Sequence, residues 1–467
     1  MARQKPQKQH PKRSDLELLN LNAAGLDIGA AEIYACVPSE RDEQPVRKFG
    51  TYTVDLHHLA DWLAACGIEL VAMESTGIYW IPAFEVLEMR GFAVSLVNAR
   101  HLKQVPGRKS DVSDCEWLQQ LHTYGLLRSS FRPDAEICAL RALVRHRQGL
   151  IESRSQQIQL MQKALEQMNI KLTQVVSDIT GVTGLSIIRA LLQGERDPAQ
   201  LAKLRNPLCQ KSETEIAKAL SGTYKSEHLF ALRQSVEAFD FYHHQLQICD
   251  REIEAHDASL PPAPPGQGTS PPAADTQKRR KNQAHFDLAV SLYRTVGVDL
   301  TAIDGIHALT AQTLISEIGL DMSRWPTVKH FTSWLGLSPH NDISGGKVLR
   351  TRTKKTKNRA NTALRLAAQS LHGSNSAVGG FYRRLRAKHG PAKATTATAH
   401  KLARIVYYML RDRTPYQDPG AQHYEQHYQQ RVLRNLQRKA QRLGMQLVPL
   451  ENRPTKALSH LAPSLVS

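Results

Sequence analysis

The fold is decided by the stretch Ala23-Ala24-Gly25-Leu26-Asp27-Ile28-Gly29, an apolar run that closes with an acid and a glycine. A second apolar run, Leu70-Val71-Ala72-Met73-Glu74, also ends in an acid. Short apolar runs bounded by turn residues are typical of buried strands. A carboxylate at the end of such a strand costs free energy unless a positive charge neutralises it. We therefore expect Asp27 and Glu74 to belong to one site.

Two more acids complete this constellation. Asp111 and Asp114 are three residues apart at the start of a predicted helix, so they share one helix face. Divalent metal ions, Mg²⁺ or Mn²⁺, would neutralise the four carboxylates, and metal pairs commonly assist phosphodiester cleavage. Unrelated surface acids are the alternative, but the order strand-acid, strand-acid, helix-acid favours a metal site. A nucleic-acid enzyme is the first hypothesis.

The charge balance indicates a polyanionic partner. The 467 residues include 61 Lys or Arg against 43 Asp or Glu, for a formal charge of +18 and a pI near 9.7. Residues 340–413 alone hold 17 Lys or Arg and two acids, Asp342 and Asp412. A basic region of this kind is the electrostatic signature of nucleic-acid binding.

Several classes of protein are disfavoured. The six cysteines are scattered without a C-x-x-C pair, so neither a zinc site nor a disulfide framework is expected. No apolar run approaches the roughly 20 residues of a membrane span. The basic residues 1–13 lack the apolar segment of a signal peptide. No P-loop is present, so nothing indicates use of ATP. We expect a soluble cytoplasmic protein.

The periodicity of the first 123 residues predicts an α/β layer with a mixed sheet. Strands are expected over 22–37, 45–54, 69–74 and 93–97, and helices over 55–66, 81–90 and from about residue 111. The acids at 27 and 74 would lie at strand ends, where sites in open sheets commonly form.

The rest of the chain reads as mainly helical. Leucines and isoleucines recur through 140–171, which predicts an extended helical pair or a coiled coil used for self-association. The Pro-rich run 260–272 reads as a linker. The predicted parts are a basic flexible arm (1–21), the α/β domain (22–130), a helical association region (131–259), the linker (260–284), a mainly α C-terminal domain (285–415) and a tail (416–467).

Two features of the C-terminal half have competing readings. The glycine turn at Gly305 precedes a helix, as in DNA-backbone-binding helix-hairpin-helix elements, but His307 stands where a second glycine is usual. An ordinary helical turn is as good a reading. Tyr407 and Tyr408 lie near basic residues, and side-chain packing on a helix explains them better than nucleophilic chemistry does.

Ser344 is the second candidate reactive group. It precedes Gly345-Gly346 on a predicted turn, where a serine would be exposed as a nucleophile must be. A plain glycine turn is the alternative, and the spacing alone favours it. A predicted basic loop follows, which would position a phosphate near the serine. We expect nucleic-acid contacts from Lys347, Arg350, Arg352, Lys354, Lys355, Lys357 and Arg359.

Taken in order, four motifs carry a family resemblance. Gly-Leu-Asp-Ile-Gly (25–29), Met-Glu-Ser-Thr-Gly-Ile-Tyr-Trp (73–80), Lys-Ser-Asp-x-x-Asp (109–114) and Ser-Gly-Gly-Lys (344–347) resemble those of the DEDD insertion-sequence transposases. That family, to which pilin-gene invertases are related, joins a RuvC-like (RNase H-fold) N-terminal domain to a serine-bearing transposase domain. The resemblance runs from about residue 22 to 413.

The resemblance implies a mechanism and a set of partners. Asp27, Glu74, Asp111 and Asp114 match the metal-binding quartet, and Ser344 matches a nucleophile that forms a phosphoserine link to DNA. Donor and target duplex DNA would be selected by a structured guide RNA, the bridge or seek RNA. Dimers would join into a tetramer in which one protomer's quartet meets another's serine, in the bacterial cytoplasm at the nucleoid.

Two alternatives stay open at this point. The first is a RuvC-type, metal-dependent, structure-specific endonuclease, in which water attacks the phosphate and Ser344 is structural. The second is a non-catalytic nucleic-acid-binding protein whose acids are inert.

Overall fold

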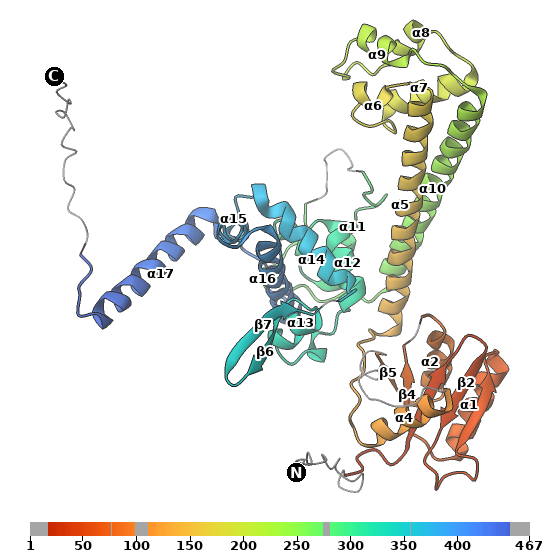
Figure 1. The fold of residues 1–467 in the computed structure, drawn as a ribbon, viewed down its shortest axis with the longest axis vertical. Coiled ribbons are helices and arrows are strands. Elements are labelled where there is room, and N and C mark those ends of the chain that lie inside the picture. The colour runs from red at the N-terminus through yellow and green to blue at the C-terminus, as the bar shows by residue number, and fades with distance from the viewer. Residues whose placement is uncertain (1–16, 76, 99–110, 274–280, 355, 449–467) are drawn as a thin grey trace, which may run out of the picture. The chain divides into compact units, whose positions relative to one another are not determined.

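The computed structural model describes residues 17–75, 77–98, 111–273, 281–354 and 356–448, with the backbone alone for 111–113. The chain forms two compact units that divide between Arg132 and Pro133. The first unit is a sheet covered by helices, and the second is helical apart from one β-hairpin (Figure 1). Within the described ranges, no helix combines the length and the apolarity needed to cross a membrane.

The first unit contains a mixed five-stranded sheet with the order β3-β2-β1-β4-β5. The central strand β1 pairs antiparallel with β2 and parallel with β4, while β3 pairs antiparallel with β2 and β5 pairs parallel with β4. This is the mixed sheet that the sequence predicts. The strands are β1 (Ala23–Ile28), β2 (Glu32–Cys36), β3 (Val46–Gly50), β4 (Leu70–Glu74) and β5 (Ala93–Val97).

The prediction of one strand over 22–37 is wrong, because the chain reverses in the middle of that range. Ile28 pairs with Ile33, and the backbone N–H of Gly29 donates to the carbonyl of Glu32 at 2.9 Å. Both isoleucines are buried in the same core, so the apolar pattern runs through the turn without marking it. The exposed residues 29–32 form the reversal.

Helices cover both faces of this sheet. Helices α1 (Thr53–Ala65) and α2 (Trp80–Met89) share a core with Leu26, Val71 and Met73 on one face. Helix α4 (Asp111–Thr123) covers the other face, where Leu118 packs with Ala72 and Val97. The predicted helices are confirmed, with starts that differ by at most two residues.

Glycine at position 25 allows α4 to lie directly on the central strand. A Cβ atom there would stand 2.3 Å from both the Cys115 carbonyl oxygen and the Gln119 backbone nitrogen. No real side chain tolerates such distances, and the atoms it would meet belong to the helix backbone, which cannot move alone. The absence of a side chain at Gly25 therefore sets the spacing between the helix and the sheet.

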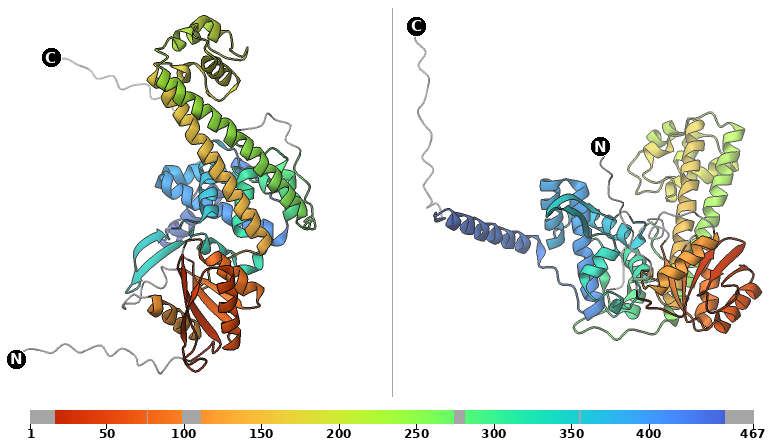
Figure 2. Two further views of the ribbon diagram at one scale, coloured as in Figure 1. Left: turned by 90° about the vertical axis from the view of Figure 1, so that its right-hand side faces the viewer. Right: turned by 60° about the horizontal axis from the view of Figure 1, so that its bottom comes forward.

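The second unit begins with a long helical hairpin. Helices α5 (Ala135–Gln167) and α10 (Ser226–Ser259) run antiparallel, because Leu140 packs near Ile253 while Met161 packs with Val236. The predicted extended helical pair is thus formed within one chain. Four short helices cap its far end (Figure 2): α6 (Leu172–Val175), α7 (Val182–Gln193), α8 (Pro198–Ala202) and α9 (Glu213–Leu220).

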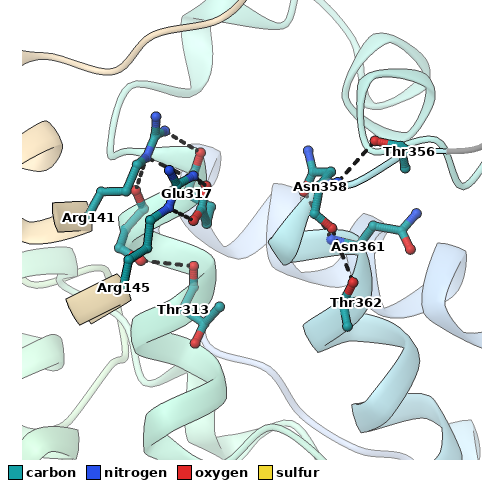
Figure 3. A network of polar contacts seen from close by, with 9 residues as sticks. Arg141, Arg145, Thr313, Glu317, Thr356, Asn358, Asn361 and Thr362 are labelled. Atoms are coloured by element: carbon teal, nitrogen blue, oxygen red, sulfur yellow. Dashed lines mark hydrogen bonds and ion pairs between the residues drawn. The ribbon is translucent and has the colours of Figure 1, made fainter. Parts of the chain in front are cut away.

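Charged side chains tie the helical hairpin to the C-terminal helices. Arg145 donates from Nε and Nη2 to the two carboxylate oxygens of Glu317 at 2.9 and 2.8 Å, and Arg141 donates to the carbonyl oxygens of Ser316 and Glu317 (Figure 3). Deeper in the hairpin, Arg147 forms an ion pair with Asp250, both almost fully buried. Such two-point pairing fixes orientation as well as distance.

The C-terminal helices surround a core built on Tyr407. Its ring packs 5.5 Å from that of Phe331, and its hydroxyl donates to the carbonyl oxygen of Trp325 at 3.0 Å, so its predicted packing role is confirmed. The elements are α11 (Leu288–Val296), α12 (Ala308–Ile318), α13 (Val328–Trp334), β6 (Pro339–Ser344), β7 (Lys347–Thr353), α14 (Arg359–Ser370), α15 (Ala377–His389), α16 (Pro391–Asp412) and α17 (Gly420–Arg442), with 3₁₀ turns at Leu300–Ala302, Met322–Arg324 and Leu371–Gly373.

Two segments that lack regular structure are held in place, one by close packing and the other by backbone hydrogen bonds. The turn at Gly305 has a φ of 85°, and a Cβ there would stand 2.7 Å from the carbonyl oxygen of Ala367 in α14. The positive φ and the close packing against α14 explain why glycine stands at position 305, which agrees with an ordinary helical turn. Residues 261–273 contain neither helix nor strand, yet Ala263 and Gly266 donate backbone hydrogen bonds to Arg294 and Gly297.

Gly25→Ala should destabilise the first unit, because the new methyl group would push α4 away from β1. Overpacking of this kind costs about 1–3 kcal/mol. Gly149→Ala is the matched control, since it lies in α5 with nothing within 4 Å of the added methyl group. The control should be neutral or slightly stabilising. Urea unfolding of the two variants measures both effects, and equal midpoints would contradict the role given to Gly25.

Candidate active site

Two of the four predicted acids lie side by side on the central strands. Leu26 of β1 is in register with Met73 of β4, so Asp27 and Glu74 occupy the next position on each strand. Neighbouring strands are about 4.8 Å apart. Side chains alternate along a strand, so both acids leave the sheet on the face opposite Leu26 and Met73. That is the face covered by α4, and both acids are half-buried there.

Helix α4 is oriented so that its first turn reaches these acids. At its end, the carbonyl of Thr123 accepts hydrogen bonds from Leu19 and Asn20, which precede β1. In its middle, Cys115 and Gln119 lie over Gly25. The helix therefore runs antiparallel to β1. One turn back along the helix and two residues forward along the strand each cover about 6 Å, which brings the start of α4 level with residue 27.

The remaining two acids belong to that first turn. Asp114 is half-buried, and Asp111 is the first residue of the helix, although its side chain lies outside the described part of the structure. Three elements that are far apart in the sequence thus contribute carboxylates to one end of the sheet. Asp27 and Glu74 also take part in further polar interactions.

The donor chemistry of this cluster fits a hard divalent cation. Mg²⁺ binds oxygen ligands, uses only one or two carboxylates, and keeps waters and substrate phosphate as its other ligands. Among the described side chains, which exclude that of Asp111, no three acids, histidines or cysteines are arranged as a ready-made metal cage. The quartet as a metal site therefore stays a prediction, one that the positions of Asp27, Glu74 and Asp114 make geometrically reasonable.

Ser344 lies at the tip of the β6–β7 hairpin. It pairs with Lys347, and the two residues between them, Gly345 and Gly346, have φ angles of 55° and 75°. A two-residue turn with both φ values positive is the type that matches the twist of a hairpin, and glycine adopts it without strain. Every residue of β6 is exposed, so the serine hydroxyl is open to a large substrate.

The hairpin also places three of the predicted cations on the face that carries Ser344. Directly paired residues on neighbouring strands project to the same face. Ser344 pairs with Lys347, Asp342 with Arg350, and His340 with Arg352. Side chains alternate between the two faces along a strand, so residues 340, 342 and 344 of β6 project to one face, and the three pairs form one surface.

A β-bulge is responsible for this alignment. Ile343 pairs with Val348 while Asp342 pairs with Arg350, which leaves Leu349 as an extra residue in β7. If Leu349 instead paired regularly with Asp342, Arg350 would stand opposite Asn341 and project to the other face. Bulges commonly redirect side chains in this manner. Here the bulge brings Arg350 and Arg352 onto the same face as Lys347 and Ser344.

The prediction of a basic loop after Ser344 is therefore wrong for residues 347–353, which form a strand. The bulge breaks the alternation that identifies strands, and the high charge obscures it further. The other predicted contacts are placed differently: Lys354 and Lys357 lie in the exposed connection to α14, and Arg359 is exposed in its first turn. Lys355 lies outside the described residues.

An open cavity of about 580 Å³ adjoins the base of the hairpin. It contains two cations, Lys354 and Arg365, and hydroxyl and amide groups, but no acid among its lining residues, which are Thr353, Lys354, Thr356, Asn361, Thr362, Arg365, Leu366 and Gln369. The amide of Asn358 caps the adjoining helix by accepting from the backbone of Asn361 at 3.1 Å (Figure 3). The chemistry of this cavity suits an anionic sugar–phosphate chain.

Two polar residues on the Ser344 face were missed as site residues. His340 and Asp342 face each other at 3.6 Å between Nδ1 and Oδ1. Their alternation with Ser344 was the available signal. His340 is four residues from Ser344, about 13 Å along a strand, so it does not reach the serine hydroxyl, whereas Asp342 is about half as far. These three residues therefore do not form a catalytic triad.

Comparison with known proteins agrees with this geometry. Residues 24–170 match a family model described as a transposase, of the DEDD type of IS110 elements, and residues 299–383 match one described as the transposase IS116/IS110/IS902 family. No curated protein matches the chain. The first match contains the RNase H-like sheet with its acids, and the second contains the serine hairpin. The chain thus belongs to the IS110 family of transposases, DNA-binding enzymes that catalyse DNA transposition.

Proposed function

We propose that this transposase cuts and rejoins DNA strands through a covalent link to Ser344, assisted by a divalent cation held by Asp27, Glu74, Asp111 and Asp114. The observation that carries the proposal is the surface of the β6–β7 hairpin. An exposed serine shares that surface with Lys347, Arg350 and Arg352. Positive charge beside a nucleophile offsets the negative charge that accumulates as a phosphoryl group is transferred.

The covalent step is a simple exchange of phosphate esters. The Ser344 hydroxyl oxygen attacks the scissile phosphorus, a serine–phosphate bond forms, and the bond from phosphorus to one DNA oxygen breaks. The serine proton is lost and the departing DNA oxygen gains one, so a free DNA hydroxyl remains. In the reverse sense, a hydroxyl of a new DNA partner displaces the serine. The phosphodiester energy is conserved in the phosphoserine, so rejoining needs no ATP.

The acidic end of the first unit would supply the metal. A divalent cation held there would polarise the scissile phosphate and lower the cost of its extra charge. Asp27 and Glu74 are fixed by the sheet, and Asp114 by α4, so the ligands are oriented before DNA binds. We propose a composite site in which one protomer's acids and another protomer's Ser344 act on the same phosphate, within a dimer or tetramer.

Ser344→Ala should abolish a DNA adduct that survives denaturation, whereas Ser338→Ala should retain it. Ser338 is a matched control because its hydroxyl donates to Thr332 at 2.9 Å within the fold. The assay uses the full chain with Mg²⁺ and a supercoiled plasmid that carries the insertion sequence encoding it.

A mixture of Ser344→Ala and Asp27→Asn chains extends the same assay. Recovery of the adduct in the mixture indicates a composite site shared by two protomers. Cleavage without any adduct, unchanged in Ser344→Ala, would contradict the serine mechanism and favour a RuvC-type endonuclease in which water attacks.

We further propose that a structured guide RNA selects the donor and target DNA. The support is the resemblance to RNA-directed members of the family, together with a basic C-terminal region large enough to contact more than one nucleic acid. RNA encoded beside the gene should copurify with the full chain. Digestion of that RNA should abolish site-specific joining, and joining that persists after digestion would contradict the guide.

A further inference from the structure

We propose that helix α17 is a second DNA-binding element, which lies in the major groove of duplex DNA. Its cationic face is formed by Arg431, Arg434, Arg438, Lys439 and Arg442, and is called here the α17 arginine face. The helix lies outside both regions that match the transposase family models. The proposal does not depend on the serine chemistry, because it concerns binding alone.

The first turns of α17 are anchored to α15. The Arg384 guanidinium carbon stands 3.2 Å from the centroid of the Tyr428 ring and 4.8 Å from that of Tyr424. The backbone N–H of Ala421 donates to the carbonyl of Asn375 at 2.9 Å. The start of the helix is thus held by the protein, while no residue along its whole length is buried.

The remainder of the helix carries positive charge without compensation. Residues 429–442 contain five Arg or Lys and no Asp or Glu. At 3.6 residues per turn, these five side chains fall within an arc of about 140°. Within the described part of the chain, Arg434, Arg438 and Arg442 have no ion-pair partner. Like charges three or four residues apart destabilise a helix, so a polyanion bound along this face would stabilise it.

Charge favours DNA over the competing occupants. The exposed Leu433 and Leu436 lie on the side of α17 opposite the α17 arginine face, and they could suit another helix. Pairing of two copies through these leucines would leave both arginine faces directed away from the contact and still open to a polyanion. The major groove of B-form DNA admits an α-helix, whereas that of double-stranded RNA is too narrow. Arginine is also the side chain that most often contacts both phosphates and guanine edges.

The test compares two triple variants of the full chain that lose the same charge. Arg431→Gln/Arg434→Gln/Arg438→Gln alters the α17 arginine face. Lys203→Gln/Lys218→Gln/Lys225→Gln is the control, since these exposed lysines lie at the end of α8, in α9 and just before α10. Binding to a 30-base-pair duplex is measured without Mg²⁺ over a series of salt concentrations, so catalysis plays no part.

The arginine variant should bind the duplex at least 10-fold more weakly near 100 mM salt. Its plot of log affinity against log salt should be shallower by about 2–3, as expected for three lost phosphate contacts. The control should stay within two-fold of the parent. Arg431→Lys/Arg434→Lys/Arg438→Lys keeps the charge and should keep most of the affinity, which guards against loss of the helix as the cause.

Three results would overturn the proposal. Equal weakening in the lysine control would show a general charge effect. Weaker binding of double-stranded RNA with unchanged DNA binding would assign the face to RNA. A lower mass in solution for Leu433→Gln/Leu436→Gln, with the arginine variant unaffected in DNA binding, would assign the helix to self-association.

Discussion

The contact between α4 and Gly25 is the constraint on which the proposed metal site at the end of the sheet depends. Because no side chain stands at position 25, the helix backbone lies on the central strand, and hydrogen bonds from Leu19 and Asn20 to Thr123 fix its direction. These two contacts place the first turn of α4 at the end of β1. The acids of two parallel strands and one helix then belong to the same end of the sheet, although they span 88 positions from residue 27 to 114.

The serine hairpin obeys a different physical rule. It has almost no core of its own, since every residue of β6 and nearly all of β7 are exposed. Its shape follows from local features: the Gly345-Gly346 turn and the extra residue Leu349. Together they put Ser344 and three cations on one surface. Cross-strand pairing brings the cations of β7 next to Ser344. The helices at the base of the hairpin are held by buried contacts, among them the hydrogen bond that Asn361 donates to the carbonyl of Leu335 at 2.7 Å.

Much of the first unit could be predicted because strands and helices have distinct periods there. The acids at residues 27 and 74 were placed at strand ends by the apolar runs before them, and the structure puts them on adjacent strands. The turn at 29–32 escaped prediction because both flanking strands contribute to one core. The direction of α4 was also beyond the sequence, since it depends on a contact between Gly25 and backbone atoms of Cys115 and Gln119.

In the second unit, the sequence predicted an extended helical pair, but it did not identify α10 as the helix that pairs with α5. The two helices are separated by 58 residues, which contain four small helices. The β6–β7 hairpin was not predicted, because its bulge disrupts the alternation on which strand prediction relies. The segment after residue 415 was predicted only as a tail. Helix α17 is mainly polar in sequence and buries none of its residues, so it lacks the buried apolar face by which most helices are predicted.

The central claim is that the acids of the sheet and the serine of the hairpin act on the same phosphate. The most direct measurement follows the yield of the denaturation-resistant DNA adduct as Mg²⁺ is titrated, for the parent chain and for Asp27→Asn. The parent should form no adduct in chelator and should form it as Mg²⁺ is added, whereas Asp27→Asn should form none at any concentration. An adduct at Ser344 that forms without divalent metal, or that persists in Asp27→Asn, would contradict the account.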